Sequence, residues 1–305
     1  MIFWGPGEAF GVLLSRPAAS KTIVLEANTF LEIADQYKAI FLDSYGVVKN
    51  HRGLIPGVPE TIHSLRAAGK TIRILTNDAS RSPEQQAERF EAQGLPGIAP
   101  EEVITSGMMA KLFLEQKVRT GSVAYLGTES AAHYILAANL NSKSVSEIDL
   151  EDCDEITAMV FLDDEGFNWN TDINTVVNLL RKQNIPAIVA NSDKLYPVAK
   201  NDVSIATGGI AKLVESILNR KFIHFGKPDT QMFNYAFEDI KRDGNFERDD
   251  ILMVGDTLHT DILGGNKFGV STVLVLSGNT RAQNADEMIR STGIIPDFVC
   301  SSIVD

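Results

Sequence analysis

The 305-residue chain carries 28 basic and 40 acidic side chains, and its net charge of -12 argues against nucleic acid as a partner, because proteins that bind the phosphate backbone need clustered Lys and Arg. For the same reason, an anionic substrate would have to be attracted by local donors, helix N-termini or a bound cation. The two cysteines, Cys153 and Cys300, form no CxxC pattern, so neither a disulfide framework nor a zinc site is indicated, and a reducing cytoplasm fits best.

The first 35 residues are predicted to be a tail and lead-in. Residues 1–20 are apolar, but they open without Lys or Arg and are interrupted by Gly5, Pro6 and Gly7. Neither this segment nor any other approaches the roughly 20 apolar residues that a membrane helix needs, so no membrane association is expected. Because single cores usually stop growing at roughly 250 to 300 residues, the rest of the chain should form two domains or one domain with an insertion.

Short β-branched runs alternate with helical patterns from residue 38 onward. We predict strands over residues 38–43 and 71–77 and helices over 59–69 and 82–94. The second helix has Ser82 as its N-cap, Pro83 at its first position and Gly94 at its end. This alternation is typical of an α/β protein with a parallel sheet, right-handed crossovers and a ligand site at the carboxyl ends of the strands.

The middle of the chain repeats this pattern. Strands are predicted over residues 122–127, 158–163 and 186–191, with a helix over 172–184, and together they indicate a second α/β unit. In the last third, strands are predicted over 221–227, 250–256 and 271–278. Charged residues again stand at strand ends there, as they do at the end of the first strand.

Polar residues at these strand ends would meet at one edge of a parallel sheet. They are Asp43, Thr76, Asn77, Lys227, Asp256 and, five residues later, Asp261. Taken singly, a strand-end Asp more often caps a turn, and a lone Lys before Pro is usually solvated. Together they suit phosphoryl transfer through an aspartyl phosphate, in which a hard cation such as Mg²⁺ and a lysine screen the repulsion between carboxylate and phosphate.

Four motifs, "FLDSYGV", "ILTN", "GKP" and "VGDTLHTDI", resemble in order those of the haloacid dehalogenase superfamily of aspartate-nucleophile hydrolases. Residues 253–278 are similar specifically to subclass IIA, which holds phosphoglycolate, pyridoxal phosphate, nucleotide and sugar-phosphate phosphatases. The resemblance implies a Rossmann-like core with a large α/β cap inserted between the second and third motifs. We therefore predict core segments over residues 36–108 and 221–305 and a cap over 109–220, and a homodimer is expected because caps mediate dimers in the subclass.

The resemblance also implies a role for each matching residue. Asp43 would be the nucleophile and a Mg²⁺ ligand, Asp256 and the Tyr45 carbonyl oxygen would be further ligands, and Asp261 would support the metal. The remaining candidates would bind the substrate, several of them through its phosphate: Lys227, Thr76, Asn77, the backbone N–H groups from Ser44 to Gly46, and Asn191 and Asp193 in the cap. For the last two, in "VANSDKLYP", an Asx turn explains the pattern equally well.

Tyr45 departs from the family pattern, in which an Asp two residues after the nucleophile serves as general acid and base. A phenol with a pKa near ~10 is a poor proton source, and loss of acid–base catalysis costs ~10² to 10⁴ in rate. We therefore expect a Mg²⁺-dependent phosphatase that is slow, selective for good leaving groups, or supplied with an acid by the cap or the substrate. Two alternatives stay open: a 2-haloacid dehalogenase, because "DxYG" also resembles its first motif, and a phosphate-ligand binding or regulatory protein without turnover.

Overall fold

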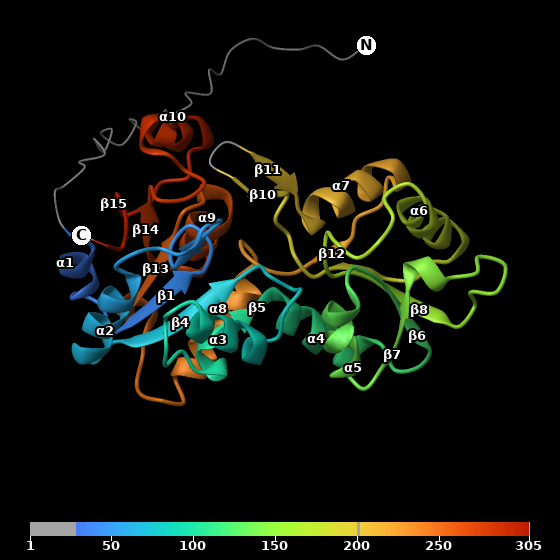
Figure 1. Ribbon diagram of the computed structural model, residues 1–305, viewed down its shortest axis with the longest axis horizontal. Helices are drawn as coiled ribbons and strands as arrows, with labels where there is room; N and C mark the ends of the chain where they lie inside the picture. Colours follow the sequence, from blue (N-terminus) through green and yellow to red (C-terminus); the bar gives the residue numbers. More distant parts are fainter. Residues whose placement is uncertain (1–28, 200–201, 305) are drawn as a thin grey trace, which may run out of the picture.

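The computed structural model describes residues 29–199 and 202–304, which form two α/β units lying side by side (Figure 1). The core contains a six-stranded sheet in the order β15-β14-β13-β1-β4-β5, and the cap contains a five-stranded sheet in the order β12-β9-β8-β6-β7. Neighbouring strands run parallel in both sheets. The predicted fold class, a Rossmann-like parallel-sheet core with an inserted α/β cap, is confirmed.

The core strands are β1 (Ala39–Asp43), β4 (Thr71–Thr76), β5 (Val103–Thr105), β13 (Ile251–Gly255), β14 (Ser271–Val275) and β15 (Phe298–Cys300). The core helices are α1 (Phe30–Ala34), α2 (Val58–Ala67), α3 (Pro83–Ala92), α8 (Thr230–Ile240), α9 (Leu263–Phe268) and α10 (Ala282–Thr292). Short turns of helix are η1 (Pro100–Glu102), η4 (Arg248–Asp250) and the π-helical η5 (Leu258–Ile262), and a small hairpin joins β2 (Lys49–Asn50) to β3 (Gly53–Leu54).

The cap strands are β6 (Ser122–Leu126), β7 (Asn141–Ser144), β8 (Ile156–Phe161), β9 (Ala187–Val189) and β12 (Ile223–His224), with a hairpin of β10 (Leu195–Pro197) and β11 (Val203–Ile205). The cap helices are α5 (His133–Leu136), α6 (Asp172–Lys182), α7 (Thr207–Leu218), η2 (Glu129–Ala132) and η3 (Val145–Glu147), and α4 (Ser106–Lys117) leads from core to cap. In the described ranges, no helix combines the length and the apolar character that crossing a membrane would take.

Alternate residues of the core strands face opposite layers of helices. Phe41 packs in one cluster with Phe233 of α8, whereas its neighbour Ile40 packs in another with Phe90 of α3. Both faces of β1 are therefore apolar, as a central parallel strand requires. Burying one such side chain contributes roughly 1.5–3 kcal/mol to the free energy of unfolding.

The predicted start of the helix at residue 82 is confirmed. The Ser82 hydroxyl accepts a hydrogen bond from the Gln85 N–H at 3.3 Å, and the Gln85 side chain accepts one from the Ser82 N–H at 2.9 Å. This capping box satisfies two N–H groups that the helix itself leaves unpaired. An N-cap of this kind is typically worth about 1 kcal/mol.

Two predicted boundaries differ from the structure. Residues 29–35 belong to the folded core, because α1 buries Phe30 and Ile33, while the rest of the predicted tail lies outside the described residues. The strand predicted over 221–227 is shorter, and Ile223 pairs with Ile188 of the cap sheet. Its apolar neighbour Phe222 is buried in the cap as well, so the chain returns to the core only after His224.

Core and cap share one apolar cluster. It runs from Leu75 of the core sheet through Leu114 of α4 to Val123 and Val160 of the cap sheet. The α4 helix is also tied to the core at its first residue, where the Ser106 hydroxyl donates to the Asn77 carbonyl oxygen at 2.8 Å. The cap is therefore packed against the core beside the edge where β1 and β4 end.

Candidate active site

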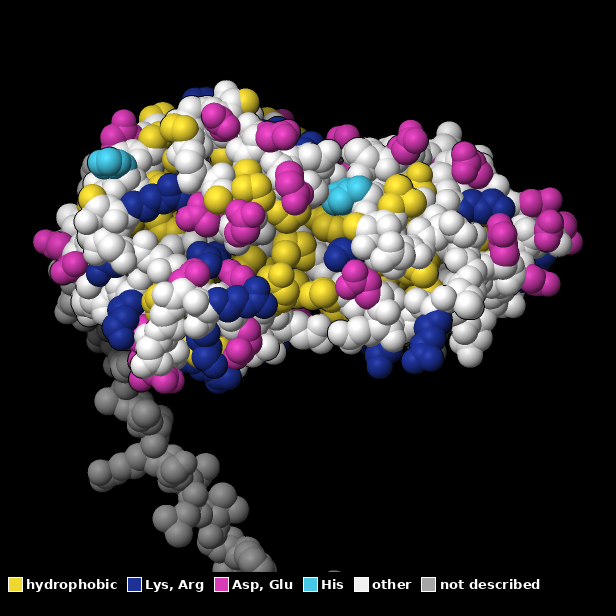
Figure 2. All heavy atoms as spheres, turned by 90° about the horizontal axis from the view of Figure 1, so that it is seen from below, with side chains coloured by type: hydrophobic (Ala, Val, Ile, Leu, Met, Phe, Trp, Pro, Cys, Tyr) yellow, Lys and Arg dark blue, Asp and Glu magenta, His cyan; other side chains and the backbone are white. Residues whose placement is uncertain are grey.

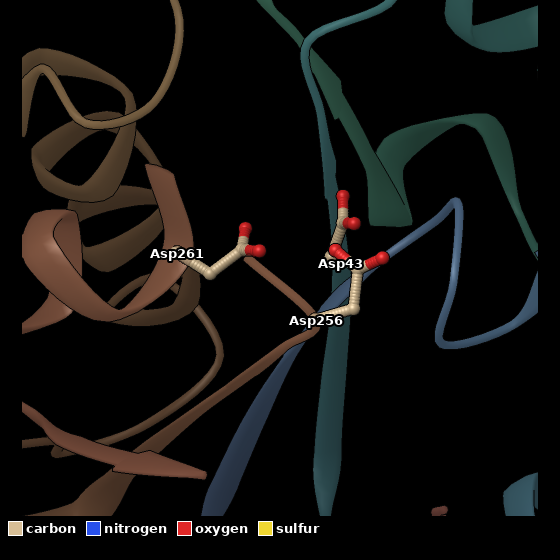
Figure 3. A group of neighbouring side chains, drawn as sticks. All are labelled: Asp43, Asp256 and Asp261. Carbon is tan, nitrogen blue, oxygen red and sulfur yellow. The ribbon is translucent and has the colours of Figure 1, made fainter. Parts of the chain in front are cut away.

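Three carboxylates from separate segments meet at the carboxyl edge of the core sheet (Figure 3). Asp43 ends β1, Asp256 follows β13, and Asp261 lies in η5. All three are buried, and one oxygen from each lies within 4.8 Å of the others. The parallel sheet thus brings together three acids that stand up to 218 positions apart in the chain.

Glycines make room for these carboxylates. A Cβ atom on Gly46 would lie 2.0 Å from Oδ2 of Asp256, and one on Gly278 would lie 1.9 Å from the same atom. Gly46 also has a φ of +87°, which other residues rarely adopt. The observed position of the Asp256 carboxylate therefore depends on two backbone segments without side chains.

Hydrogen bonds from neighbouring residues orient the acids. Asp256 accepts from the Asn279 N–H at 2.6 Å and from the Thr257 hydroxyl at 2.8 Å, and Asp261 accepts from the Thr257 N–H at 3.1 Å. Sequence reasoning missed Thr257 and Asn279. The available signal was their place directly after the strands predicted to end at residues 256 and 278.

Lys227 is buried between two of the acids. Its ammonium nitrogen lies 2.5 Å from Oδ1 of Asp43 and 2.7 Å from Oδ1 of Asp261, and it donates to the Leu75 carbonyl oxygen at 2.9 Å. Burial alone would lower the pKa of Lys227, but the charges of Asp261 and Asp43 outweigh it and raise the pKa above its ordinary value. The side chain therefore stays a cation.

The donor set fits a divalent cation. Three buried carboxylates face one buried ammonium, so negative charge is left over. Burial raises the pKa of Asp43 well above its usual range against the opposing effect of Lys227, and burial together with the Asp261 charge raises the pKa of Asp256 to about 7. Hard cations bind such oxygen-only sets and would relieve this repulsion.

The end of β4 positions the lysine. Asn77 brackets Lys227, because its Oδ1 accepts from the Lys227 N–H at 2.7 Å and its Nδ2 donates to the Lys227 carbonyl oxygen at 3.0 Å. Thr76 and Asn77 are both buried, and the Thr76 hydroxyl oxygen accepts from the Asp78 N–H at 3.2 Å. The Thr76 hydroxyl keeps its own hydrogen to donate.

The loop after Asp43 holds the other predicted phosphate donors. Ser44 is buried, and its Oγ has no hydrogen-bond partner in the described part of the chain. The Gly46 N–H donates to the Lys49 carbonyl oxygen at 2.7 Å, so this amide is engaged within the loop. Gly46 instead leaves space for the Asp256 carboxylate, because it has no side chain.

The two cap candidates have different positions. Oδ1 of Asn191 accepts from the Asp193 N–H at 2.9 Å, which is the Asx turn that the sequence allowed. Oδ1 of Asp193 accepts from Nδ2 of Asn77 at 2.8 Å and so reaches the core. Burial raises the pKa of Asp193, although the Asn77 hydrogen bond and the Lys227 charge oppose the shift.

Tyr45 lies partly buried at the same edge, two residues after the nucleophile candidate. Its hydroxyl donates a hydrogen bond of 2.6 Å to the carbonyl oxygen of Pro197 in the cap strand β10. Burial, and then the Asp256 charge, raise the pKa of Tyr45. The phenol is therefore a weaker acid than an ordinary tyrosine.

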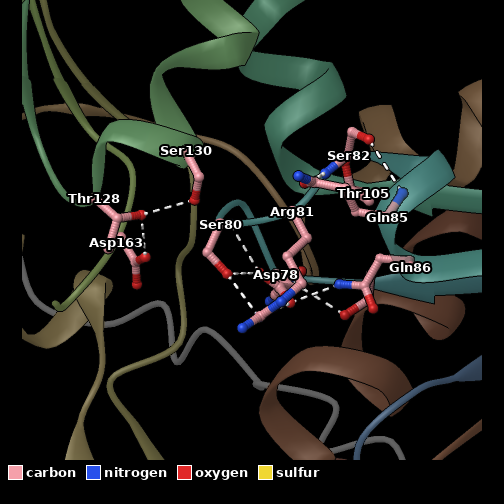
Figure 4. A network of polar contacts seen from close by, with 12 residues as sticks. Asp78, Ser80, Arg81, Ser82, Gln85, Gln86, Thr105, Thr128, Ser130 and Asp163 are labelled. Carbon is pink, nitrogen blue, oxygen red and sulfur yellow. Dashed lines mark hydrogen bonds and ion pairs between the residues drawn. The ribbon is translucent and has the colours of Figure 1, made fainter. Parts of the chain in front are cut away.

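A polar network lies where the loop after β4 meets the cap (Figure 4). Asp78 accepts from the Ser80 hydroxyl and from Nε2 of Gln86, both at 2.6 Å. On the cap side, the Thr128 hydroxyl donates to Asp163 at 3.0 Å. Sequence reasoning did not assign Asp78 a role, although it directly follows the "LTN" motif.

A separate groove of about 790 Å³ lies between α4, α8 and α9. Phe113, Tyr235 and Phe268 are among its lining residues, and none of the candidate site residues is. Apolar side chains gather in the middle of the face shown in Figure 2, between core and cap. Because none of the candidate site residues lines the groove, it is distinct from the carboxylate cluster.

Comparisons with known proteins place these features in a family. A family model described as "haloacid dehalogenase-like hydrolase" matches residues 40–141. A second family model, described as "HAD-hydrolase-like", matches residues 224–305. A solved structure from Cytophaga hutchinsonii, described as a possible sugar phosphatase of the HAD superfamily, is 51% identical with a TM-score of 0.88, and the match covers 91% of this chain and 98% of that one.

More distant relatives match along most of their length. Chronophin from Rattus norvegicus is 28% identical, and the match covers 92% of this chain and 90% of chronophin. A glycerol phosphate phosphatase from Mycobacterium tuberculosis, solved in complex with magnesium, is 24% identical with a TM-score of 0.73, and the match covers 89% of this chain and 76% of that one. The latter likeness concerns the fold.

Proposed function

The chain belongs to the haloacid dehalogenase-like hydrolase superfamily, and from this premise we propose that it is a Mg²⁺-dependent phosphohydrolase acting on a small phosphorylated metabolite. The observation that carries the proposal is the buried cluster of Asp43, Asp256 and Asp261 with Lys227 between two of its members. The phosphatase names of related proteins support hydrolysis of a phosphoric monoester.

In the proposed reaction Asp43 is the nucleophile. One of its carboxylate oxygens bonds to phosphorus, the bond from phosphorus to the leaving oxygen breaks, and that oxygen takes up a proton. Water then attacks the phosphorus of the aspartyl phosphate and releases phosphate and Asp43. Lys227, 2.5 Å from Asp43, is placed to neutralise charge on the transferring oxygens.

Asp43, Asp256 and the Tyr45 carbonyl oxygen would hold the Mg²⁺ ion. When bound, the ion supplies the screening that lets a carboxylate approach a phosphate. Both oxygens of Asp261 are already engaged, one with Lys227 and one with the Thr257 N–H. This supports a role for Asp261 in orienting Lys227 beside the metal.

We propose that Asp193 protonates the leaving oxygen, in place of the acid that Tyr45 does not provide. Asp193 is a cap carboxyl bonded to Asn77, and Asn77 in turn brackets Lys227. The raised pKa of Asp193 favours the protonated form that a general acid needs. A turnover that is slow, or selective for good leaving groups, is still expected, because Asp193 also has to keep its bond to the core.

The leaving group would lie between the loop after β4 and the cap. Ser80, Thr128, Ser130 and Asp163 offer hydroxyl and carboxylate groups in that region. Such groups suit a polyhydroxylated leaving group, so a sugar or polyol phosphate is the substrate class we propose. The name of the Cytophaga hutchinsonii relative agrees with this choice.

We also propose a homodimer formed through the cap. Large apolar side chains on α7 and the β10–β11 hairpin are about half exposed: Leu195, Val203, Ile205, Leu213 and Ile217. Exposed apolar patches often mark protein–protein contacts, and a second copy of the chain would cover this one. A cytoplasmic location is proposed on separate grounds, because two cysteines without a CxxC pattern indicate no disulfide framework, which fits a reducing compartment.

The test is a phosphatase screen with Mg²⁺ across sugar phosphates, nucleotides, pyridoxal phosphate, acyl phosphates and p-nitrophenyl phosphate. We expect turnover that is faster on aryl or acyl phosphates than on alkyl phosphates. Halide release from a 2-haloacid without Mg²⁺ would support the dehalogenase alternative instead. No turnover on the panel, combined with Mg²⁺-dependent thermal stabilisation by one metabolite, would support the binding-protein alternative.

A further inference from the structure

Tyr45 makes a direct contact between the catalytic loop and the cap. Its hydroxyl donates to the carbonyl oxygen of Pro197 at 2.6 Å, across 152 positions of sequence. Pro197 follows Asp193 by four residues in the loop and strand that approach the core. The residue that occupies the usual acid position is thus bonded to the cap segment that carries the acid proposed above.

The other end of this cap segment is also tied down. Asp193 accepts from Asn77 at 2.8 Å, and the Ser192 hydroxyl donates to the carbonyl oxygen of Phe225 at 2.6 Å. Asn77 belongs to the core, and Phe225 lies on the return connection to it. Residues 192–197 are therefore held at one end by Asn77 and Phe225 and at the other end by Tyr45.

The segment is packed from the cap side as well. A Cβ atom on Gly208 would lie 2.5 Å from the carbonyl carbon of Ser192, and one on Gly209 would lie 2.5 Å from the carbonyl oxygen of Lys194. The first turn of α7 therefore lies directly against the backbone of the segment. Because of this close packing, contacts that fix the position of residues 192–197 also restrict movement of the first turn of α7.

We propose that Tyr45 is a positioning residue whose hydroxyl fixes the cap segment 192–197, and with it Asp193, over the carboxylate cluster. This inference rests on the proposed phosphohydrolase function for its kinetic consequences, but the contact itself does not. In this chain the residue at position 45 holds the cap against the core through its hydroxyl group and does not transfer a proton. Loss of the hydroxyl is expected to slow every substrate, because the cap segment closes the site, and to slow alkyl phosphates most, because their leaving oxygen depends on the position of Asp193.

The test compares Tyr45→Phe with Tyr196→Phe. The Tyr196 hydroxyl donates to Asp164 within the cap at 2.9 Å, so the control loses a hydroxyl from the same segment without touching the core. Kinetics on p-nitrophenyl phosphate and on glycerol phosphate are measured together with amide hydrogen exchange of residues 191–198. A hydrogen bond contributes modestly, so changes of about 3- to 10-fold are expected.

For Tyr45→Phe we expect kcat/KM to fall on both substrates, and further on glycerol phosphate because its leaving oxygen needs the proton of Asp193, and we expect exchange of residues 191–198 to quicken. Tyr196→Phe should quicken exchange of residues 191–198 less than Tyr45→Phe does and should leave the kinetic constants near those of the native protein. A loss confined to the alkyl phosphate, with exchange of residues 191–198 unchanged, would make Tyr45 a proton donor and overturn the proposal. Unchanged exchange and kinetics would also overturn it.

Hydrogen exchange separates this inference from the proposed function. If the native protein hydrolyses no phosphate ester, the proposed function fails. Faster exchange in Tyr45→Phe would still show that the hydrogen bond from Tyr45 to Pro197 holds the cap segment in place. Tyr45→Asp adds an independent arm, because an aspartate is too short to reach Pro197 as the phenol does. Its exchange should match that of Tyr45→Phe even where the new carboxyl group raises alkyl-phosphate turnover.

Discussion

Nδ2 of Asn77 lies 2.8 Å from Oδ1 of Asp193, so a side chain at the end of a core strand is bonded to a carboxyl group of the cap. Asn77 holds Lys227 with the remaining parts of the same amide. One side chain thus contacts both Lys227 and Asp193. The proposed chemistry of Asp193 can be separated from its packing by the isosteric change to asparagine, which keeps an oxygen for this contact.

Asp193→Asn is expected to lower kcat on an alkyl phosphate by about 10²- to 10⁴-fold and kcat on p-nitrophenyl phosphate far less, because the amide cannot transfer a proton that only the poor leaving group needs. The new side chain keeps an oxygen that can accept from Asn77. Steady-state kinetics on the two substrates check this, with Asn191→Ala as a change in the same loop that leaves the carboxyl group in place. Equal losses on both substrates for Asp193→Asn would leave Asp193 with a packing role only.

Asp43→Asn is expected to abolish turnover on every phosphate ester, because the amide is not a nucleophile. Folding should survive, since Lys227 keeps its contact with Asp261. Phosphate release and thermal unfolding are measured side by side. Asp250→Asn, which removes a surface partner of Lys38, is the matched control and should keep full activity. Residual turnover in Asp43→Asn would assign the nucleophile elsewhere.

Mg²⁺ should stabilise the protein more at pH 8 than at pH 5. The pKa of Asp256 is raised from 3.8 to about 7 in the fold, so between these values the unfolded carboxyl group ionises while the folded one keeps its proton. The metal-free fold therefore loses stability as pH rises through this window, and the loss ends above about pH 7. A cation reverses it by binding the ionised form.

This pH dependence is checked by melting curves at pH 5 and pH 8 with EDTA or with MgCl₂. At a concentration of 100 times Kd, Mg²⁺ would add about 2.7 kcal/mol. Asp256→Asn should remove most of the difference between the two pH values. A stabilisation by Mg²⁺ that is equal at both would contradict the assignment of Asp256 as a ligand.

Gly278→Ala should remove the Mg²⁺ response and lower activity at least about tenfold, because its Cβ would lie 1.9 Å from Oδ2 of Asp256 and displace that carboxylate. Gly244→Ala is the matched control, since its Cβ would meet nothing closer than a ring atom of Phe246 at 3.2 Å. Activity titrated with MgCl₂ measures both variants. Wild-type metal dependence in Gly278→Ala would show that Asp256 can move without cost.

The double variant Leu213→Glu with Ile217→Glu should be a monomer, because two charges would have to be buried in the proposed cap interface. Light scattering coupled to size exclusion gives the mass directly. Leu136→Glu, a comparably exposed position on α5 at 57%, should leave the dimer intact. A native protein that already runs as a monomer would end the homodimer proposal.

Much of the core and its acids could be predicted from the sequence, because the signals are local. A buried strand such as β1 has a continuous apolar run, and a parallel sheet brings strand ends to one edge whatever the details of packing. Asp43 and Asp256 could therefore be placed together before the structure was known. Ser82 could be predicted as a cap, because its partner lies three residues away.

The tertiary structure decided the contacts that depend on how the cap packs. Lys227 reaches the site from a connection that follows a cap strand, because Ile223 finds its partner in the cap sheet. No local pattern shows that the Tyr45 hydroxyl bonds to Pro197 or that Asp193 bonds to Asn77. The sequence alone determined which residues carry charge and hydroxyl groups at the strand ends. Only the fold decided which of them meet across 116 or 152 positions of chain, because such contacts depend on the packing of two whole sheets and not on neighbouring residues.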